Sequence, residues 1–164
     1  MSAASPSLPG SPSPRTAPPA GALRHFALEA RVYYEDTDAG GIVYHANYLR
    51  WMERVRTEWL RALGAHHSEL AGREGLQFVV SELSIRYLRP ARLDDLIRVD
   101  LQVTELKRAS LRLSQSVWPV TDSEDVGERR RPLVEAVVRV AVMNRNTARP
   151  AALPAWLLRT LGSE

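Results

Sequence analysis

Apolar residues occupy every second position over several short stretches of the chain, which is the spacing of half-buried β-strands. The first stretch runs from His25 to Glu35. Its apolar positions are Phe26, Leu28, Ala30, Val32 and Tyr34. Further stretches of this kind cover residues 76–87, 97–103, 111–117 and 134–142. Within 76–87 the alternation changes phase, which predicts a β-bulge at Ser81 or Glu82. The pattern therefore predicts five strands.

One long stretch has the period of an α-helix instead. It follows Gly40 and Gly41, and its apolar residues form a single helical stripe: Tyr48, Met52, Val55, Trp59 and Leu63. Asn47 is predicted to be the N-cap and Gly64 the terminator, which gives a helix of about 16 residues. A short amphipathic segment, 154–161, follows the last strand.

The order of these elements predicts the fold class. One strand, one long helix and four further strands favour an antiparallel sheet with the helix packed on one face, an α+β architecture. A sheet laid around one central apolar helix is the hotdog fold. Residues 1–20 contain five Ser, six Pro, four Ala and one Gly. We therefore expect a disordered tail over 1–23 and a single domain over 24–164.

Composition excludes several kinds of site. The 164 residues include no cysteine, so disulfides, thiolate metal sites and a cysteine nucleophile are excluded. The net charge is +3, and Lys107 is the one lysine among 22 basic residues. No run of five basic residues occurs, so nucleic acid is not an expected partner. No apolar stretch is long enough for a membrane span, and we expect a cytoplasmic protein.

Chemically versatile residues concentrate between the first predicted strand and the helix. The segment Tyr33–Tyr48 holds Asp36, Asp38 and His45 together with two glycines. Carboxylates can act as base or nucleophile, and the free N–H groups of a helix start can stabilise an oxyanion. Hydrolysis of an acyl group needs both. Asp and Thr also favour turns and caps for local reasons, so this pattern alone leaves a structural role equally open.

Two ordered motifs resemble a known enzyme family. The first runs through 31–38 and 41–48 to the helical residues 53–54 and 56–58, and the second covers 85–95. They are similar to the 4-hydroxybenzoyl-CoA thioesterase-like hotdog family, in its Tol-Pal-associated acyl-CoA thioesterase branch. The resemblance covers about residues 24–145. It implies metal-independent hydrolysis of an acyl-CoA to a free carboxylic acid and coenzyme A, with no cofactor besides the coenzyme A of the substrate.

The resemblance also implies the catalytic residues. The aspartate of the family matches Asp38, which either attacks the thioester carbonyl or activates water. Its oxyanion donor is a backbone N–H at the helix start, seven positions later, which is His45. The His45 side chain matches a histidine that assists thiolate departure or orients water. Another hotdog branch uses a glutamate on the central helix in place of the loop aspartate. Because the loop aspartate is present here, we expect the helical residues Glu53 and Glu58 to be structural.

Substrate-binding residues follow from the same motifs. Tyr44 and Asn47 are expected to line or order the junction. Three arginines of the second motif, Arg86, Arg89 and Arg92, are candidates for binding the phosphates of coenzyme A. The adjacent His66 and His67 are expected to form a surface turn rather than a metal site, because suitably spaced acidic partners are missing.

The resemblance further implies a homodimer whose sheets join edge to edge with active sites at the interface, or a homotetramer of such dimers. Acyl-CoA is the expected partner, and acyl carrier protein is a second possible one. Two alternatives remain: a non-catalytic hotdog adaptor that binds acyl carrier protein or phospholipid-synthesis enzymes, and a dehydratase of the same fold. The sequence leaves open the acyl chain length and whether Asp38 acts covalently or as a base.

Overall fold

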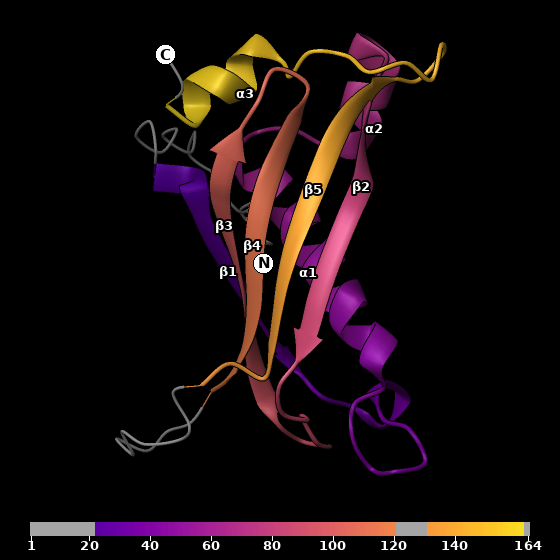
Figure 1. Cartoon of the computed structure of the whole chain (residues 1–164), viewed down its shortest axis with the longest axis vertical. Helices are drawn as coiled ribbons and strands as arrows, with labels where there is room; N and C mark the ends of the chain where they lie inside the picture. The colour runs from indigo at the N-terminus through magenta and orange to yellow at the C-terminus, as the bar shows by residue number, and fades with distance from the viewer. Residues whose placement is uncertain (1–21, 121–130, 163–164) are drawn as a thin grey trace, which may run out of the picture.

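The computed structural model describes residues 22–120 and 131–162 (Figure 1). One antiparallel sheet has the strand order β1-β3-β4-β5-β2, which places β1 and β2 at its two edges. The strands are β1 (His25–Arg31), β2 (Leu76–Tyr87), β3 (Leu96–Leu106), β4 (Ser110–Pro119) and β5 (Val134–Asn144). The helices are α1 (His45–Ala62), α2 (His67–Glu69) and α3 (Ala155–Thr160), with 3-10 turns at Ala22–Arg24 and Tyr34–Asp36 and a π turn at Leu70–Glu74. Figure 1 shows α1 lying along one face of the sheet.

The predicted α+β hotdog architecture is confirmed. All four neighbouring strand pairs are antiparallel. The register between β2 and β5 shifts between Val80 and Glu82, where the change of phase predicted a bulge. The predicted tail 1–23 lies outside the described residues except for Ala22 and Leu23, which belong to the first 3-10 turn. None of the helices in the described part is long and apolar enough to cross a membrane.

Two predicted boundaries are wrong, both at the junction that holds the candidate chemistry. The first strand ends at Arg31 rather than Glu35, and the chain turns through a short 3-10 helix that leaves Tyr34 81% exposed. The long helix begins at His45, with Tyr44 as its N-cap. Asn47 is therefore not the N-cap but a buried residue of the first turn.

The core lies between α1 and the inner face of the sheet. The predicted stripe is buried at Tyr48, Met52, Val55 and Trp59, and Trp51 is buried as well. Inward-facing residues of the three central strands meet this stripe: Val99, Leu101, Leu113, Val117, Val134 and Val138. Burial of apolar area is the main favourable contribution to folding, so α1 is held in place chiefly by this contact.

One polar link crosses the core between helix and sheet. The Arg56 guanidinium on α1 donates to Gln115 Oε1 on β4 at 2.7 Å, and Gln115 Nε2 donates to the Met52 carbonyl at 3.0 Å. Gln115 is 1% exposed. Burial lowers the pKa of Arg56, and the nearby Glu53 carboxylate opposes that shift. A buried donor without a partner is costly. Gln115 therefore holds the Arg56 side chain in position and supplies the acceptor that its guanidinium needs.

Replacing Gln115 by leucine should therefore destabilise the protein. The Gln115→Leu change keeps a similar volume but leaves the Arg56 guanidinium without this acceptor, and we expect the free energy of unfolding to fall by about 1–3 kcal/mol. Urea unfolding followed by circular dichroism measures it. The matched control is Gln102→Leu, at an exposed position of β3, which should change stability by less than about 0.5 kcal/mol. Equal losses in the two variants would contradict the role assigned to Gln115.

Candidate functional site

Asp36 holds the junction between β1 and α1 together. Its Oδ2 accepts a hydrogen bond from the Tyr33 N–H at 2.8 Å, and its Oδ1 accepts one from Asn47 Nδ2 at 3.2 Å. Its carbonyl accepts a third from the Tyr44 N–H at 2.8 Å. Because Asn47 is 4% exposed, this contact anchors the loop to the buried first turn of the helix. Asp36 therefore has a structural role in the junction.

Asp38, two residues later, lies in a different environment. Its side chain is exposed, and its Oδ1 accepts the Gly40 N–H at 2.8 Å. The Asp38 N–H donates to the Ile42 carbonyl at 2.9 Å, and the Gly41 N–H donates to the Asp38 carbonyl at 3.0 Å. Gly41 has φ +74°, which only glycine adopts at low cost. Among the described residues, Asp38 Oδ2 has no hydrogen-bond donor, so one carboxylate oxygen faces solvent.

The first turn of α1 offers free backbone donors. Tyr44 forms no side-chain cap. Within residues 22–120 and 131–162, the N–H groups of His45 and Ala46 have no acceptor, whereas the Asn47 N–H donates to the Tyr44 carbonyl at 2.9 Å. Free N–H groups at a helix start bind anions, because they carry the positive end of the helix dipole. This turn is therefore a suitable place for an oxyanion.

The segment after β2 lies against this loop and completes the junction. The Val43 N–H donates to the Ala91 carbonyl at 2.9 Å, and Ile42 forms a β-bridge with Arg92. The Ala91 N–H donates to the Tyr48 hydroxyl at 2.9 Å. Burial raises the pKa of Tyr48, although the hydrogen bond from Ala91 opposes that shift. The two motifs that carry the family resemblance thus form one structural unit.

A cavity of about 250 Å³ opens where these segments meet β2. Its walls are formed by Ile42, Val43, His45, Tyr48, Tyr87, Leu88, Arg89 and Pro90. The His45 imidazole lies near the rings of Tyr44 and Tyr87, with centroid separations of 4.5 and 6.1 Å. Most of the wall is apolar, and a small number of polar groups converge on it, which is typical of ligand sites.

The predicted site residues are only partly brought together. Tyr44, His45 and Asn47 gather at the helix start with the Asp38 loop beside them, but Asp38 itself is not part of the cavity wall. Arg89 is in the wall, where Nη2 donates to the Arg131 carbonyl and Nε is buried without a partner in the described structure.

The other two arginines occupy different places. Arg92 is exposed, and its backbone N–H donates to Asp95 Oδ2 at 2.8 Å. Arg86 pairs with Glu135 at 3.6 Å, and its side chain is 72% exposed. Its strand neighbours Ile85 and Tyr87 align with inward residues of β5, so Arg86 lies on the opposite face of the sheet from α1. The structure therefore does not bring Arg86 to the cavity.

The wall includes two tyrosines, Tyr48 and Tyr87, that are not among the predicted site residues. The helical period predicts Tyr48 to be part of the core stripe, and Tyr87 belongs to the strand predicted over residues 76–87. Tyr87 is the last residue of β2, and its hydroxyl donates to the His45 carbonyl at 3.1 Å. Its position inside the second motif, 85–95, was the available signal for a place near the site.

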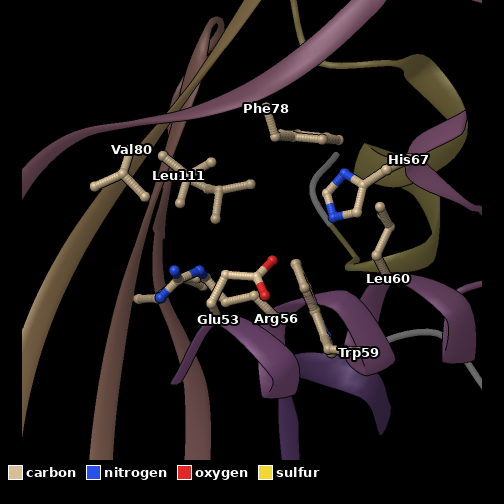
Figure 2. Close-up of a pocket in the computed structure, with 10 residues that line it drawn as sticks. Glu53, Arg56, Trp59, Leu60, His67, Phe78, Val80 and Leu111 are labelled. Carbon is tan, nitrogen blue, oxygen red and sulfur yellow. The ribbon is translucent and has the colours of Figure 1, made fainter. Parts of the chain in front are cut away.

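A second cavity, of about 160 Å³, lies between the C-terminal half of α1 and β2 (Figure 2). Trp59, Leu60, Phe78 and Val80 give it an apolar lining, and Glu53 and Arg56 reach it from α1. His67 also lines it, with its ring 6.4 Å from that of Phe78. His67 belongs to the short α2 helix and is exposed, in keeping with the predicted surface position. No group of three or more His, Asp or Glu residues that could hold a metal occurs in the described part.

The sequence matches the model of a known protein family. The model of a family described as the thioesterase superfamily matches residues 40–125. The chain belongs to this superfamily. Its resemblance to the acyl-CoA thioesterases of the family is confirmed by relatives of similar length.

The chain is 42% identical over 129 residues to the acyl-CoA thioesterase YbgC of Haemophilus influenzae, covering 79% of this chain and 88% of that protein. It is 39% identical over 131 residues to the acyl-CoA thioester hydrolase YbgC of Escherichia coli, covering 79% of this chain and 90% of that protein.

Solved structures agree with this assignment. A probable thioesterase from Bartonella henselae is 38% identical, with a TM-score of 0.68, and the match covers 79% of this chain and 99% of that one. A 1,4-dihydroxy-2-naphthoyl-CoA thioesterase from Synechocystis is 20% identical, with a TM-score of 0.73, over 84% of this chain and 96% of that one. The second similarity shows the shared fold alone.

Proposed function

We propose that the protein hydrolyses acyl-CoA thioesters to a carboxylic acid and coenzyme A. The observation that carries this proposal is that the short Asp38 loop leads directly into the first turn of α1. Among the described residues, Asp38 Oδ2 and the N–H groups of His45 and Ala46 are all left without a partner. Acyl hydrolysis needs a base or nucleophile together with donors for an oxyanion. Membership of the thioesterase superfamily and the names of the YbgC relatives support the same reaction.

The chemistry divides among three groups at the junction. Asp38 removes a proton from water as it adds to the thioester carbon, or adds to that carbon itself and is then released by water. The N–H groups of His45 and Ala46 stabilise the oxyanion of the tetrahedral intermediate. Its collapse breaks the C–S bond, and the thiolate of coenzyme A takes up a proton, which the His45 imidazole delivers.

Substrate binding draws on the surroundings of the cavity. Arg89 and Arg92 supply cations for the phosphates of coenzyme A, and Arg89 is the better placed because it lines the cavity. Tyr44 is 46% exposed beside His45 and borders the acyl group. Asn47 acts through Asp36 and orders the loop. The coenzyme A of the substrate is the one nucleotide required, and the mechanism uses neither a resident cofactor nor a metal.

Thiol release from a series of acyl-CoA esters tests this reaction. The wild-type protein should release coenzyme A from esters of some chain length, and Asp38→Asn should lower kcat at least about 100-fold, because the substituted amide is neither a base nor a nucleophile.

The matched control is Glu35→Gln, since Glu35 is an exposed carboxylate of the same loop. It should retain kcat within about twofold, as expected for a surface group outside the reaction. Circular dichroism confirms that both variants are folded. Full activity in Asp38→Asn would contradict the assigned role, and a folded wild-type protein that releases no thiol from any ester would contradict the reaction.

We propose further that two chains join through β2. This strand is at a sheet edge, and its apolar side chains are unusually exposed: Val80 (50%), Leu83 (39%) and Tyr87 (46%). Edge strands expose unpaired backbone groups, which pairing with another chain satisfies. A two-fold antiparallel pairing of β2 would put the Phe78 end of one strand beside the Tyr87 end of the other. Each Figure 2 cavity would then face the catalytic junction of the partner, and a homotetramer would unite two such dimers.

The matched substitutions Val80→Lys and Val137→Lys test this interface. Both valines are exposed, at 50% and 42%, but Val137 lies on the interior strand β5. Val80→Lys should shift the mass measured by light scattering to that of a monomer at micromolar concentration, since it buries a charge in an apolar contact. Val137→Lys should retain a dimer. A monomeric wild type, or an unchanged mass for folded Val80→Lys, would contradict pairing through β2.

A further inference from the structure

The last residue of β2, Tyr87, connects the edge of the sheet to the first turn of α1. Its O–H donates to the His45 carbonyl at 3.1 Å, although the two residues are 42 positions apart. A carbonyl has two lone pairs, so His45 can accept this bond beside the one expected within the helix. Burial raises the pKa of Tyr87, so its phenol remains a donor at neutral pH.

The ring of Tyr87 packs against the side chain of the same residue, His45. It meets the His45 imidazole edge to face, with centroids 6.1 Å apart and an interplanar angle of 88°. It also lies 5.9 Å from the Tyr48 ring, which is buried in the core. Tyr44 lies 4.5 Å from the imidazole. The imidazole is therefore packed against two aromatic rings, and Tyr87 alone also contacts the His45 backbone through a hydrogen bond.

We propose that Tyr87 is a positioning residue, which holds the His45 peptide and imidazole in the orientation that the oxyanion and the leaving thiolate require. This inference rests on the proposed function. The helix start needs such a restraint because no side chain caps it within the described part of the chain, and the ends of uncapped helices fray. A donor displaced by a fraction of an ångström loses much of its effect on a transition state.

The substitution Tyr87→Phe removes the hydroxyl but keeps the ring, and so separates the effect of the hydrogen bond from that of ring packing. Loss of one neutral hydrogen bond should lower kcat about 3- to 10-fold. KM should stay within about twofold, because the hydroxyl acts on the transition state through His45. Tyr87→Leu also removes the ring and should lower kcat further. The kcat of Tyr87→Phe should therefore lie between that of Tyr87→Leu and that of the wild type. The matched control is Tyr34→Phe, at an 81% exposed tyrosine outside the cavity, which should leave both constants unchanged.

A measurement without substrate tests the tether itself. Amide hydrogen exchange, followed by nuclear magnetic resonance, should be about 3- to 10-fold faster at two amides of the first turn of α1 in Tyr87→Phe than in the wild type or Tyr34→Phe. These are Asn47, whose N–H donates to the Tyr44 carbonyl, and Leu49, which follows His45 by four positions in the helix. Unchanged exchange at these amides would overturn the proposal, as would an unchanged kcat or a loss confined to KM. A wild type that hydrolyses no ester would instead count against the proposed function, and the exchange rates would still decide whether the tether exists.

Discussion

The candidate site depends on the hydrogen bonds that the Asp36 carboxylate accepts. This carboxylate receives hydrogen bonds from the Tyr33 backbone and from Asn47, and so joins the end of β1 to the first buried turn of α1. These bonds help to fix the path of the loop between strand and helix. With them, the next acidic residue, Asp38, is held in a tight turn closed by Gly40 and Gly41. Two carboxylates in one short loop thus have different environments: Asp36 is bound to the backbone and to the helix, and Asp38 is exposed.

The same junction depends on distant parts of the chain. In the segment that follows β2, the Ala91 carbonyl accepts a hydrogen bond from the loop, and the Ala91 N–H donates one to the Tyr48 hydroxyl of the helix. Tyr87 adds a hydrogen bond to the first helical carbonyl. Because α1 is fixed in turn by its buried stripe and by the link between Arg56 and Gln115, the loop that holds Asp38 rests on a rigid scaffold. Sites supported in this way keep their geometry better than sites on free loops.

Much of the fold could be predicted from the sequence, because side-chain periodicity reports directly on which face of an element is buried. The five strands, the central helix and the bulge in β2 follow from it. The end of β1 and the start of α1 could not be predicted in this way. Asparagine is a residue type favoured at N-caps, but the side-chain amide of Asn47 donates to Asp36, 11 residues earlier. Capping preferences do not take such contacts into account.

The candidate site shows the same division. Asp38, His45 and Arg89 came from the family resemblance, whereas the bond between Tyr87 and His45 joins residues that no local pattern connects. The outward position of Arg86 is consistent with the alternation predicted over residues 76–87, because its neighbours Ile85 and Tyr87 align with inward residues of β5. To decide which of the three arginines can reach the cavity therefore requires the register of the strand as well as the motif.

The central claim is that Asp36 supports the loop and Asp38 performs the chemistry. A comparison of Asp36→Asn with Asp38→Asn, measuring both the free energy of unfolding and kcat for thiol release, tests it most directly. The account predicts that Asp36→Asn loses about 1–3 kcal/mol of stability, because charged hydrogen bonds are lost. It predicts that Asp38→Asn keeps its stability within about 1 kcal/mol and loses kcat by at least about 100-fold. Equal effects of the two substitutions on both quantities, or the reverse assignment, would contradict the account.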